Sequence, residues 1–481
     1  MTSNQSAQEN GAVSTRRDFI KTTTKAAVAV SALAGVKLPH VHAQGSDQIS
    51  VALIGCGGRG GGAAKNALSV KKGSVRLAAM ADVFKDKLDN AFGALKRDRQ
   101  VGDDVDVSDD RKFLGFDAYK KAMDTLKKGD VAIFTTPCAF REVNFRYAIE
   151  KGLHVFMEKP VTADGPSSRR MLQLAEESVK KNLKVGVGLM SRHSRALQQL
   201  HKRIQDGELG DIILMRGYRM HGPVGSMASL PRPMQPGAQN LTEVMYQIRR
   251  FHSFLWASGG CYSDFYIHHI DHLCWMKNAW PVKAQGIGGR HYKNSPEGIP
   301  YVDQNFDSYA VEYTFADGAK MYMDGRCING TKPIYNSWVH GSKGIAIASK
   351  ANDCGEPSSI YKGQNPTNEN KLWESKTPPG ETDPYQNEWV ALIDAIRNDK
   401  PHNEAKRGVE ASLVTSMGRM AAHTGQEITF DEMLNHEHEY APNVDKLTED
   451  GPAPLTPDAN GRYPIPMPGQ LGNREYGPSA A

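Results

Sequence analysis

Short apolar runs alternate with helix-like stretches along the first part of the chain. The strand-like runs lie at residues 49–54, 75–81, 131–135, 154–157 and 184–189. The helix-like stretches between them include residues 62–68, 142–151 and 166–181. This alternation predicts a parallel sheet with crossover helices. Ligands in such sheets bind beyond the carboxyl ends of the strands, so we expect Thr136, Pro137 and the residues just after 157 to line a cleft.

The pattern changes after residue 190. Residues 309–315 and 320–324 alternate apolar and polar positions and are joined by Ala316-Asp317-Gly318, which is typical of a hairpin. With a further short strand at 345–348, they predict a largely antiparallel sheet with one face covered by helices and the other free to pack against a second subunit. Amphipathic helices are expected at 385–398 and 408–424. From residue 440 onward prolines and glycines dominate, which favours an extended arm over a packed element.

These patterns predict an α/β protein. A doubly wound, Rossmann-type domain is expected at residues 48–190 and an α+β domain with a large, mainly antiparallel, open-faced sheet at 191–440. A Pro/Gly-rich arm at 441–481 follows. We expect the second domain to bind substrate and to form a homo-oligomer, a dimer or a tetramer.

The first 43 residues are excluded from this fold because they are typical of an export signal. Arg16 and Arg17 precede an apolar stretch at 26–36 that is too short to span a bilayer, and Val41-His42-Ala43 is a plausible cleavage site. A twin-arginine signal predicts a periplasmic or otherwise exported protein that meets the twin-arginine translocase after folding. The alternative is a disordered basic leader.

Charge and cysteine usage exclude several classes of function. The formal net charge is +5 and the basic residues are dispersed, so nucleic-acid binding has no support. The six cysteines form no short-spaced pairs, which indicates neither a zinc site nor a disulfide framework.

The loop after the first predicted strand carries the first candidate chemistry. Its residues are Gly55, Cys56, Gly57, Gly58, Arg59 and Gly60. Glycines at these positions allow a tight turn, the approach of backbone amides to a pyrophosphate and close packing of the following helix. Asp82 ends the next strand, where a carboxylate can bind ribose hydroxyls and would repel a 2'-phosphate. The cofactor expected here is NAD, and Arg59 leaves NADP open. Thr136, Pro137, Glu158 and Lys159 are expected beside it.

Glu158-Lys159-Pro160 directly follows the strand at 154–157. Proline restricts the residue before it, which holds Lys159 at the mouth of the cleft. An ammonium group there can stabilise charge on a substrate oxygen during hydride transfer. The alternative is an exposed loop lysine paired with Glu158.

A second candidate group comprises Asp264, His268, Asp271 and His272. If residues 259–272 form one helix, Asp264 and His268 share a face, where a carboxylate can orient an imidazole that accepts a proton. Two other interpretations remain: a metal site that uses His268, His272 and a carboxylate, and a solvated polar helix face. A nearby nicotinamide site favours catalysis, and no metal is predicted.

Taken together, the glycine loop, Asp82, Thr136-Pro137, Glu158-Lys159-Pro160 and the segment from Asp264 to Asp271 resemble the Gfo/Idh/MocA oxidoreductases over residues 48–440. The resemblance implies NAD(P)-dependent oxidation or reduction of sugar and cyclitol hydroxyls. By this resemblance Lys159, Asp264 and His268 match the catalytic residues of the family. Two departures concern the pocket: Cys138-Ala139-Phe140-Arg141 follows the Thr-Pro turn, and Tyr266 replaces a glycine, which we expect to place a ring near the active face.

The sequence thus predicts an exported oxidoreductase that acts on a sugar or polyol. His268 would accept the hydroxyl proton, Asp264 would orient His268, and Lys159 would hold the reacting oxygen. The further candidates for substrate contact are Arg192, His193, Tyr246, Arg249 and Asp271. The alternatives are a glycosidase with a retained NAD, a non-catalytic sugar-sensing or scaffold protein, and a metal-dependent hydrolase.

Overall fold

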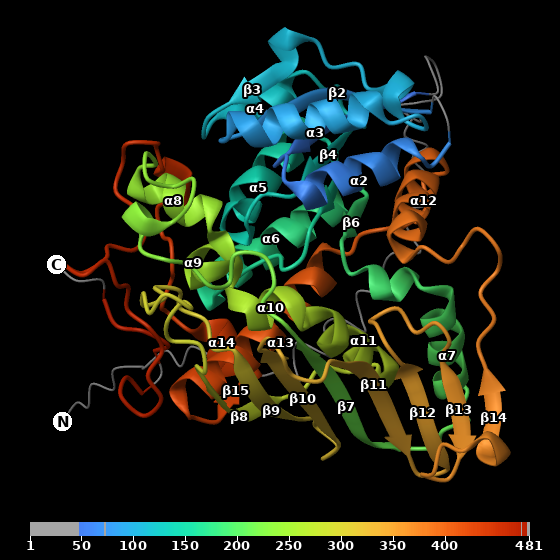
Figure 1. Cartoon of the computed structure of the whole chain (residues 1–481). Coiled ribbons are helices and arrows are strands. Elements are labelled where there is room, and N and C mark those ends of the chain that lie inside the picture. Colours follow the sequence, from blue (N-terminus) through green and yellow to red (C-terminus); the bar gives the residue numbers. More distant parts are fainter. Residues whose placement is uncertain (1–47, 72–73, 473, 479–481) are drawn as a thin grey trace, which may run out of the picture. The chain divides into compact units, whose positions relative to one another are not determined.

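The computed structural model describes residues 48–71, 74–472 and 474–478, and Figure 1 shows its helices and strands. The predicted export signal at residues 1–43 lies outside the described residues. In the part of the chain that is described, no helix combines the length and the apolar character needed to cross a bilayer.

The first domain contains the predicted parallel sheet. Its strands are β1 (Ile49–Ile54), β2 (Val75–Asp82), β3 (Lys112–Leu114), β4 (Val131–Phe134), β5 (His154–Met157) and β6 (Val185–Val187). They are ordered β3-β2-β1-β4-β5-β6, and every pair is parallel. The order reverses between β1 and β4, which creates a crevice beyond their carboxyl ends.

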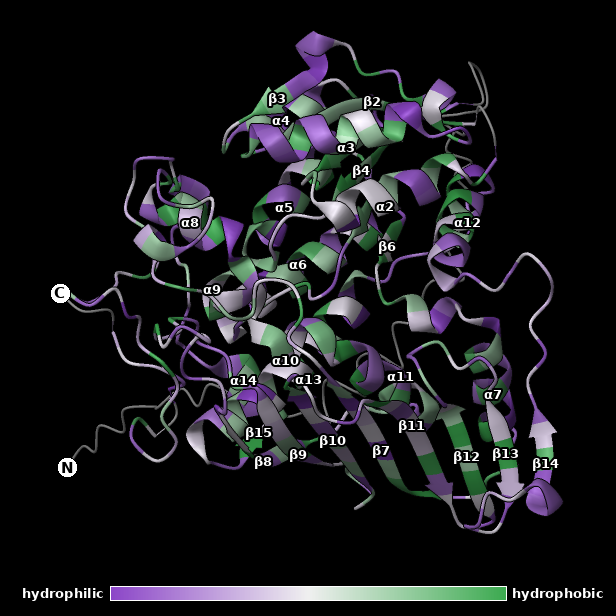
Figure 2. Cartoon of the chain, viewed as in Figure 1, coloured by the Kyte–Doolittle hydropathy of each residue, from purple (hydrophilic) through white to green (hydrophobic). Residues whose placement is uncertain are grey.

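Helices cover both faces of this sheet. They are α2 (Gly58–Leu68), α3 (Lys85–Arg97), α4 (Ala118–Asp124), α5 (Arg141–Lys151) and α6 (Gly165–Lys180). In α3 the buried residues Leu88, Ala91 and Leu95 recur at helical spacing, and Figure 2 shows hydrophobic and hydrophilic bands alternating along this helix. At the start of α6 the Asp164 side chain accepts a hydrogen bond from the Ser167 amide at 2.8 Å.

The second domain contains a nine-stranded mixed sheet, which confirms the predicted fold class. Its strands are β7 (Ile212–His221), β8 (Lys283–Gly289), β9 (Ser308–Thr314), β10 (Lys320–Cys327), β11 (Ile334–Gly341), β12 (Gly344–Ser349), β13 (Ser359–Lys362), β14 (Lys371–Glu374) and β15 (Ile428–Thr429). Their order is β14-β13-β12-β11-β7-β10-β9-β8-β15. Only β7 and β10 pair in parallel among these strands, and β9 and β10 form the hairpin predicted at 309–324.

The described part of the second half of the chain adds eight helices. They are α7 (Arg195–Gln205), α8 (Glu243–Arg249), α9 (Leu255–Ser258), α10 (Gly260–Phe265), α11 (Ile267–Lys277), α12 (Pro384–Arg397), α13 (Ala405–Thr424) and α14 (Phe430–Asn435). Of these, α11 and α13 pack on the second sheet on the side that faces the first domain (Figure 1). Helix α12 returns to the first domain, where Trp389 packs on Phe156 with ring centroids 4.5 Å apart. Helix α13 contacts α6 on one side and β8 on the other.

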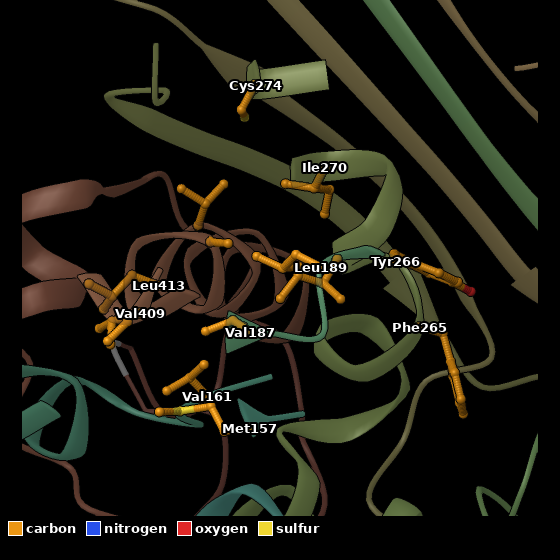
Figure 3. Packing of buried hydrophobic residues seen from close by; sticks show 14 of the residues in the cluster. Met157, Val161, Val187, Leu189, Phe265, Tyr266, Ile270, Cys274, Val409 and Leu413 are labelled. Atoms are coloured by element: carbon orange, nitrogen blue, oxygen red, sulfur yellow. The ribbon is translucent and has the colours of Figure 1, made fainter. Parts of the chain in front are cut away.

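The two sheets consequently share a hydrophobic interior. Figure 3 shows Met157 and Val161, which flank the Lys159 segment, near Val409 and Leu413 of α13, with Ile270 of α11 in the same cluster. The positions of β5, α11 and α13 are therefore coupled by packing. This packing sets where the candidate catalytic segments meet.

The C-terminal segment differs from the prediction of an arm without packing. Its described residues, 441–472 and 474–478, contain almost no regular secondary structure. Leu455, Tyr463 and Tyr476 are nevertheless buried and join a cluster with Trp256 and Phe254 of the second domain. Frequent prolines prevent helices and ladders here, while the aromatic residues between them supply apolar area to bury. The tail is thus an irregular but packed element.

Candidate active site

The glycine loop follows β1 and is shaped by contact with β4. Gly55 has φ +95°, and a Cβ there would lie 2.6 Å from the Thr136 amide nitrogen. A Cβ on Gly60 would lie 2.1 Å from the Gly55 carbonyl oxygen. At Gly57 and Gly58, by contrast, a Cβ would meet nothing within 4 Å. The loop is thus tight on the strand side and open at the start of α2.

The open side suits a phosphate group. Gly57 is the N-cap of α2 and provides no side-chain cap, and the first turn carries no acidic residue. The first amides of a helix lack intrahelical partners and favour an anion. Gly57, Gly58 and Gly60 line a cavity of about 640 Å³, which is a size suited to a small ligand or cofactor. The residues present therefore fit a dinucleotide.

Asp82 lies in the same cavity, at the end of β2. Its carboxylate accepts hydrogen bonds from the amides of Cys56 at 2.6 Å and Phe84 at 2.8 Å. Burial raises the pKa of Asp82 above its ordinary value, and these amide hydrogen bonds oppose the shift. The two amides fix the carboxylate where a ribose would bind, and Lys87 lines the cavity nearby.

Arg59 is directed toward acidic residues. Its guanidinium bonds Glu158 at 2.6 Å and Glu388 at 3.3 Å, and it stacks on the Tyr385 ring at 4.7 Å from the centroid. Neither of these ion pairs involves Asp82, and one of the two partners, Glu158, immediately precedes Lys159. Arg59 thus joins the glycine loop to the end of β5.

Thr136 and Pro137, which follow β4, line the cavity. Arg141 is fully buried and donates to the carbonyl oxygens of Phe134 at 2.8 Å and Thr136 at 3.0 Å, which fixes this strand end. Cys138 contacts the Ala257 carbonyl oxygen at 3.3 Å. The unusual residues after the Thr-Pro turn therefore attach the first domain to α9.

Lys159 and Asp264 come together from the two domains. The Lys159 ammonium donates to the Asp264 carbonyl oxygen at 2.6 Å and to Asp264 Oδ1 at 3.0 Å. His252 Nε2 lies 3.3 Å from Asp264 Oδ2. Burial alone would raise the pKa of Asp264, but the charge of Lys159 and the hydrogen bond from His252 lower it well below its ordinary value. Asp264 is therefore a carboxylate at neutral pH, with a cation or imidazole on each oxygen.

His252 connects this pair to the cofactor cavity. It lines the cavity together with Ser226 and Phe251 of the second domain. Its Nδ1 lies 3.0 Å from Ser226 Oγ, and its ring stacks on Phe265 with centroids 5.5 Å apart. No sequence pattern singled out His252, because its partner Asp264 is twelve positions away and belongs to a different helix.

The helix predicted across residues 259–272 is interrupted. Helix α10 ends at Phe265 and α11 begins at Ile267, so Asp264 and His268 do not lie on one continuous helix. The Tyr266 ring is fully buried and lies against Gly325, where a Cβ would be 2.0 Å from the ring. The expectation of a ring near the active face was therefore wrong, because the glycine in β10 leaves room for Tyr266 against the sheet.

His268 occupies a neighbouring polar cluster. Burial lowers its pKa to about 3, against the opposing charge of Asp353, and its Nδ1 has no hydrogen-bond partner among the described residues. Tyr335 donates to Asp353 at 2.6 Å, and Arg219 lies 3.7 Å from the same carboxylate. Lys159 and Asp264 also act on the pKa of His268, so all three predicted catalytic residues lie within electrostatic range of one another. His268 is neutral at neutral pH.

The further substrate candidates are mostly engaged within the protein. Arg192 and Asp271 form a buried pair with two contacts of 2.8 Å, and His193 lies 3.2 Å from Glu404. Tyr246 donates to the Leu230 carbonyl oxygen at 2.5 Å. Arg249 pairs with Asp86 at 2.7 Å and, unlike these other candidates, lines the cavity.

Sequence reasoning missed Arg219, Asp353 and His252. Arg219 lies on β7 and Asp353 on the loop after β12, and each is an ordinary polar residue of its segment. Among the described residues, no group of three or more histidine, cysteine or acidic side chains has an arrangement that would hold a metal ion.

Comparison with known proteins agrees with this geometry. Residues 49–202 match the Gfo/Idh/MocA family model, described as an oxidoreductase family with an NAD-binding Rossmann fold. Residues 49–202 are thus similar to the NAD-binding Rossmann domains of that family. The cofactor predicted from the glycine loop is confirmed at this level.

The curated relatives match over short segments. Inositol 2-dehydrogenase of Corynebacterium glutamicum (strain R) is 32% identical over 96 residues, which cover 20% of this chain and 28% of that enzyme. Inositol 2-dehydrogenase of Rhodococcus jostii (strain RHA1) is 26% identical over 170 residues, which cover 35% of this chain and 41% of that enzyme. The chain thus matches less than half the length of either enzyme.

Solved structures match over both domains. An oxidoreductase domain protein from Kribbella flavida has a TM-score of 0.61 at 17% identity, covering 80% of this chain and 99% of its own. Levoglucosan dehydrogenase in complex with NADH and levoglucosan has a TM-score of 0.59 at 16% identity, with coverage of 80% and 99%. At these identities the likeness shows the fold, a Rossmann domain followed by a mixed-sheet domain.

Proposed function

We propose that this protein is an NAD-dependent oxidoreductase that transfers a hydride between a hydroxyl-bearing carbon of a sugar or polyol and the nicotinamide. The observation that carries this proposal is the contact of Lys159 with Asp264, joined through His252 to the cavity that the glycine loop opens. The named relatives and structural neighbours, inositol and levoglucosan dehydrogenases among them, support the substrate class.

In this proposal Lys159, His252 and Asp264 have different roles in proton transfer from the substrate hydroxyl. The Lys159 ammonium holds the reacting oxygen and stabilises the charge that develops on it. We assign the base to His252, because it contacts both Asp264 and the cavity, whereas the sequence alone had suggested His268. Asp264 orients the imidazole. NAD, when bound, supplies the hydride acceptor.

In this proposal His268 binds substrate and does not act as the base. An imidazole with a pKa of about 3 is too weak a base for proton removal at neutral pH, but its neutral ring can exchange hydrogen bonds with a substrate hydroxyl. Arg219 and Asp353 stand beside it and offer further donors and acceptors. A polyhydroxylated ring presents groups that such a polar wall can bind.

The test is Lys159→Ala, assayed for NADH formation over a panel of sugars and polyols. We expect turnover to be lost while the nucleotide still binds, because Lys159 is not part of the phosphate loop or the ribose site. Full activity in this variant would end the assignment. If the wild-type protein releases a sugar from a glycoside without accumulation of NADH, it is the glycosidase of the alternative hypothesis. The named relatives do not favour that alternative. Failure to bind a nicotinamide nucleotide would favour a non-catalytic role.

The preference for NAD over NADP is part of the proposal. The Asp82 carboxylate is held by two amides at the ribose end, where it would repel a 2'-phosphate. Arg59, the residue that had left NADP open, is paired with Glu158 and Glu388 and is therefore not free to neutralise that phosphate.

We further propose that the protein is exported through the twin-arginine pathway, on the basis of Arg16, Arg17 and the apolar stretch that follows. Changing both arginines to lysine is expected to retain the protein in the cytoplasm, as measured by cell fractionation. Unchanged export would reject the signal. This test is independent of the enzyme assay.

We also propose a homo-oligomer formed through the uncovered face of the second sheet. Ile213 and Ile287 on this sheet are 58% and 74% exposed, which is high for large apolar side chains. Light scattering of the purified protein measures the mass, and Ile287→Asp is expected to shift it toward the monomer. A monomeric wild-type protein would refute this part.

A further inference from the structure

Arg419 of α13 is a fully buried cation whose five N–H groups all have acceptors. Its Nε and one terminal nitrogen donate to Glu475 at 2.9 and 3.0 Å. The remaining N–H groups donate to backbone and hydroxyl oxygens of three other segments. A guanidinium presents these donors in a rigid planar fork, so the segments it bonds are fixed relative to one another.

Two of those segments carry the proposed catalytic residues. On one side Arg419 donates to the Ala163 carbonyl oxygen at 2.9 Å, four residues after Lys159. On the other side it donates to the Gly259 carbonyl oxygen at 2.8 Å and to Ser263 Oγ at 2.9 Å, immediately before Asp264. Arg419 therefore spans the two chain segments whose side chains meet in the Lys159–Asp264 contact.

The sequence around Arg419 allows this bridge, by which we mean the hydrogen bonds of Arg419 to Ala163, Gly259 and Ser263. Gly259 has φ +74°, and a Cβ there would lie 3.1 Å from the Arg419 guanidinium, so a glycine allows the close approach. Ser412, about two helical turns before Arg419 on α13, accepts a hydrogen bond from the Val161 amide at 2.9 Å. Helix α13 thus holds the chain after Lys159 at two successive points.

The counterion of Arg419 comes from the C-terminal tail. Glu475 is fully buried, and its carboxylate also accepts from His423 Nδ1 at 2.8 Å and from the Tyr440 hydroxyl. Burial alone would raise the pKa of Glu475, but the charge of Arg419 lowers it well below its ordinary value. The tail therefore places a full negative charge in the interior, next to the bridge.

We propose that Arg419 and Glu475 are positioning residues: the tail orients Arg419, and Arg419 sets the distance between the Lys159 segment and the Asp264 helix. This inference rests on the proposed function for its catalytic meaning, but the geometry it describes is measurable without a substrate. Neither side chain lines the cofactor cavity, so both act through residues that they hold.

The experiment treats the full-length protein with acetic anhydride and measures, by mass spectrometry of its peptides, how fast Lys159 is acetylated. In the wild type the ammonium is held by Asp264 and is expected to react slowly. In Glu475→Gln, which keeps the shape but removes the charge, we expect Lys159 to react about tenfold faster or more, because a hydrogen bond to a charged group is lost. The affinity for NAD is expected to stay unchanged.

Lys184 supplies an internal control in every sample. Its ammonium is buried and donates to Asn182 at 2.7 Å and Asp399 at 2.8 Å, at the opposite end of the parallel sheet from Lys159. If a variant merely loosens the fold, the acetylation rates of both lysines should rise. If Glu475 positions the Lys159 segment, the rate of Lys159 alone should rise. Equal acceleration of both, or no change at Lys159, would overturn the proposal.

Two further variants keep the test available if Glu475→Gln does not fold. Arg419→Lys keeps the charge but loses the planar fork, and Lys159 is again expected to react faster. Arg290→Lys is the matched control, because Arg290 forms a buried pair with Asp303 and contacts neither bridged segment. Its Lys159 rate should equal that of the wild type.

Measurements of kcat distinguish failure of the positioning role from failure of the proposed enzymatic function. With an active substrate, Glu475→Gln is expected to lower kcat by on the order of 10²-fold with little change in the Kd for NAD, as expected for misplaced catalytic groups. If Lys159→Ala retains full activity while Glu475→Gln still exposes Lys159, the proposed function fails and the positioning geometry stands. If Lys159→Ala is inactive and Glu475→Gln leaves the acetylation rate unchanged, the positioning role fails alone.

Discussion

Substitution of single glycines in the loop after β1 separates nucleotide binding from folding. Gly57 has φ −68° and ψ 178°, which alanine adopts freely, and a Cβ there meets no atom within 4 Å. We therefore expect Gly57→Ala to fold with wild-type stability. If the open space holds the pyrophosphate, the added methyl group overpacks it, at a cost of about 1–3 kcal/mol in binding. That cost corresponds to a Kd for NAD raised about 5- to 150-fold.

Gly60→Ala is expected to give the opposite result. Its Cβ would lie 2.1 Å from the Gly55 carbonyl oxygen, a backbone atom that cannot move without displacing the loop. Overpacking of this kind costs about 3 kcal/mol, which lowers the Tm of a unit of this size by roughly 3 °C. Gly61→Ala is the matched control, because its Cβ also meets nothing within 4 Å but Gly61 does not line the cavity.

The assays are calorimetric titration with NAD, on protein stripped of bound nucleotide, and thermal unfolding followed by circular dichroism. Gly61→Ala should match the wild type in Kd and be slightly more stable, since alanine is the better helix former. Wild-type affinity in Gly57→Ala would refute the assignment of the open space to the pyrophosphate. Wild-type stability in Gly60→Ala would refute the packing argument.

Three further predictions concern single residues of the site. Asp82→Ser is expected to raise the affinity for NADP by on the order of tenfold or more, since a like charge near the 2'-phosphate is removed; titration with both nucleotides measures it, and an unchanged NAD/NADP ratio would contradict the role of Asp82. His252→Ala is expected to lower kcat, whereas His268→Ala is expected mainly to raise KM; steady-state kinetics with an active substrate decide, and the reverse pattern would return the base to His268. The folded-state pKa of His268 is about 3 and its unfolded value is about 6.5, so the unfolded chain binds the extra proton between these values. The unfolding free energy should therefore fall as the pH is lowered from 6.5 toward 3, by up to about 1.4 kcal/mol per pH unit from this group, and His268→Phe should reduce that slope in urea titrations.

Much of the fold follows from local pattern. The runs at 49–54 and 131–135 are buried parallel strands because they are continuously apolar, and Gly55, with φ +95°, marks a turn after β1 that few other residues allow. The hairpin at 309–324 was predicted from period-two alternation around Asp317-Gly318. These features depend on neighbouring residues, which is why a single sequence reveals them.

Other features depend on residues that are distant in the sequence. Gly325 in β10 allows Tyr266 to turn away from the active face, and this relation becomes visible once the two segments are packed. The tail was expected to be unpacked because its prolines exclude regular elements, yet its aromatic residues and Glu475 are buried. Local periodicity carries no information on such burial, since the partners lie on α8, α9 and α13.

The sequence by itself determined the class of site: a dinucleotide loop ending in Gly60, a carboxylate at Asp82, and a lysine fixed before Pro160. Each is a local motif in which chemistry and spacing are set by adjacent residues. The tertiary structure decided which groups meet. It paired Asp264 with Lys159 and His252 and placed His268 beside Asp353, because contacts between separate elements are set by the packing of two domains on α13 and not by sequence spacing.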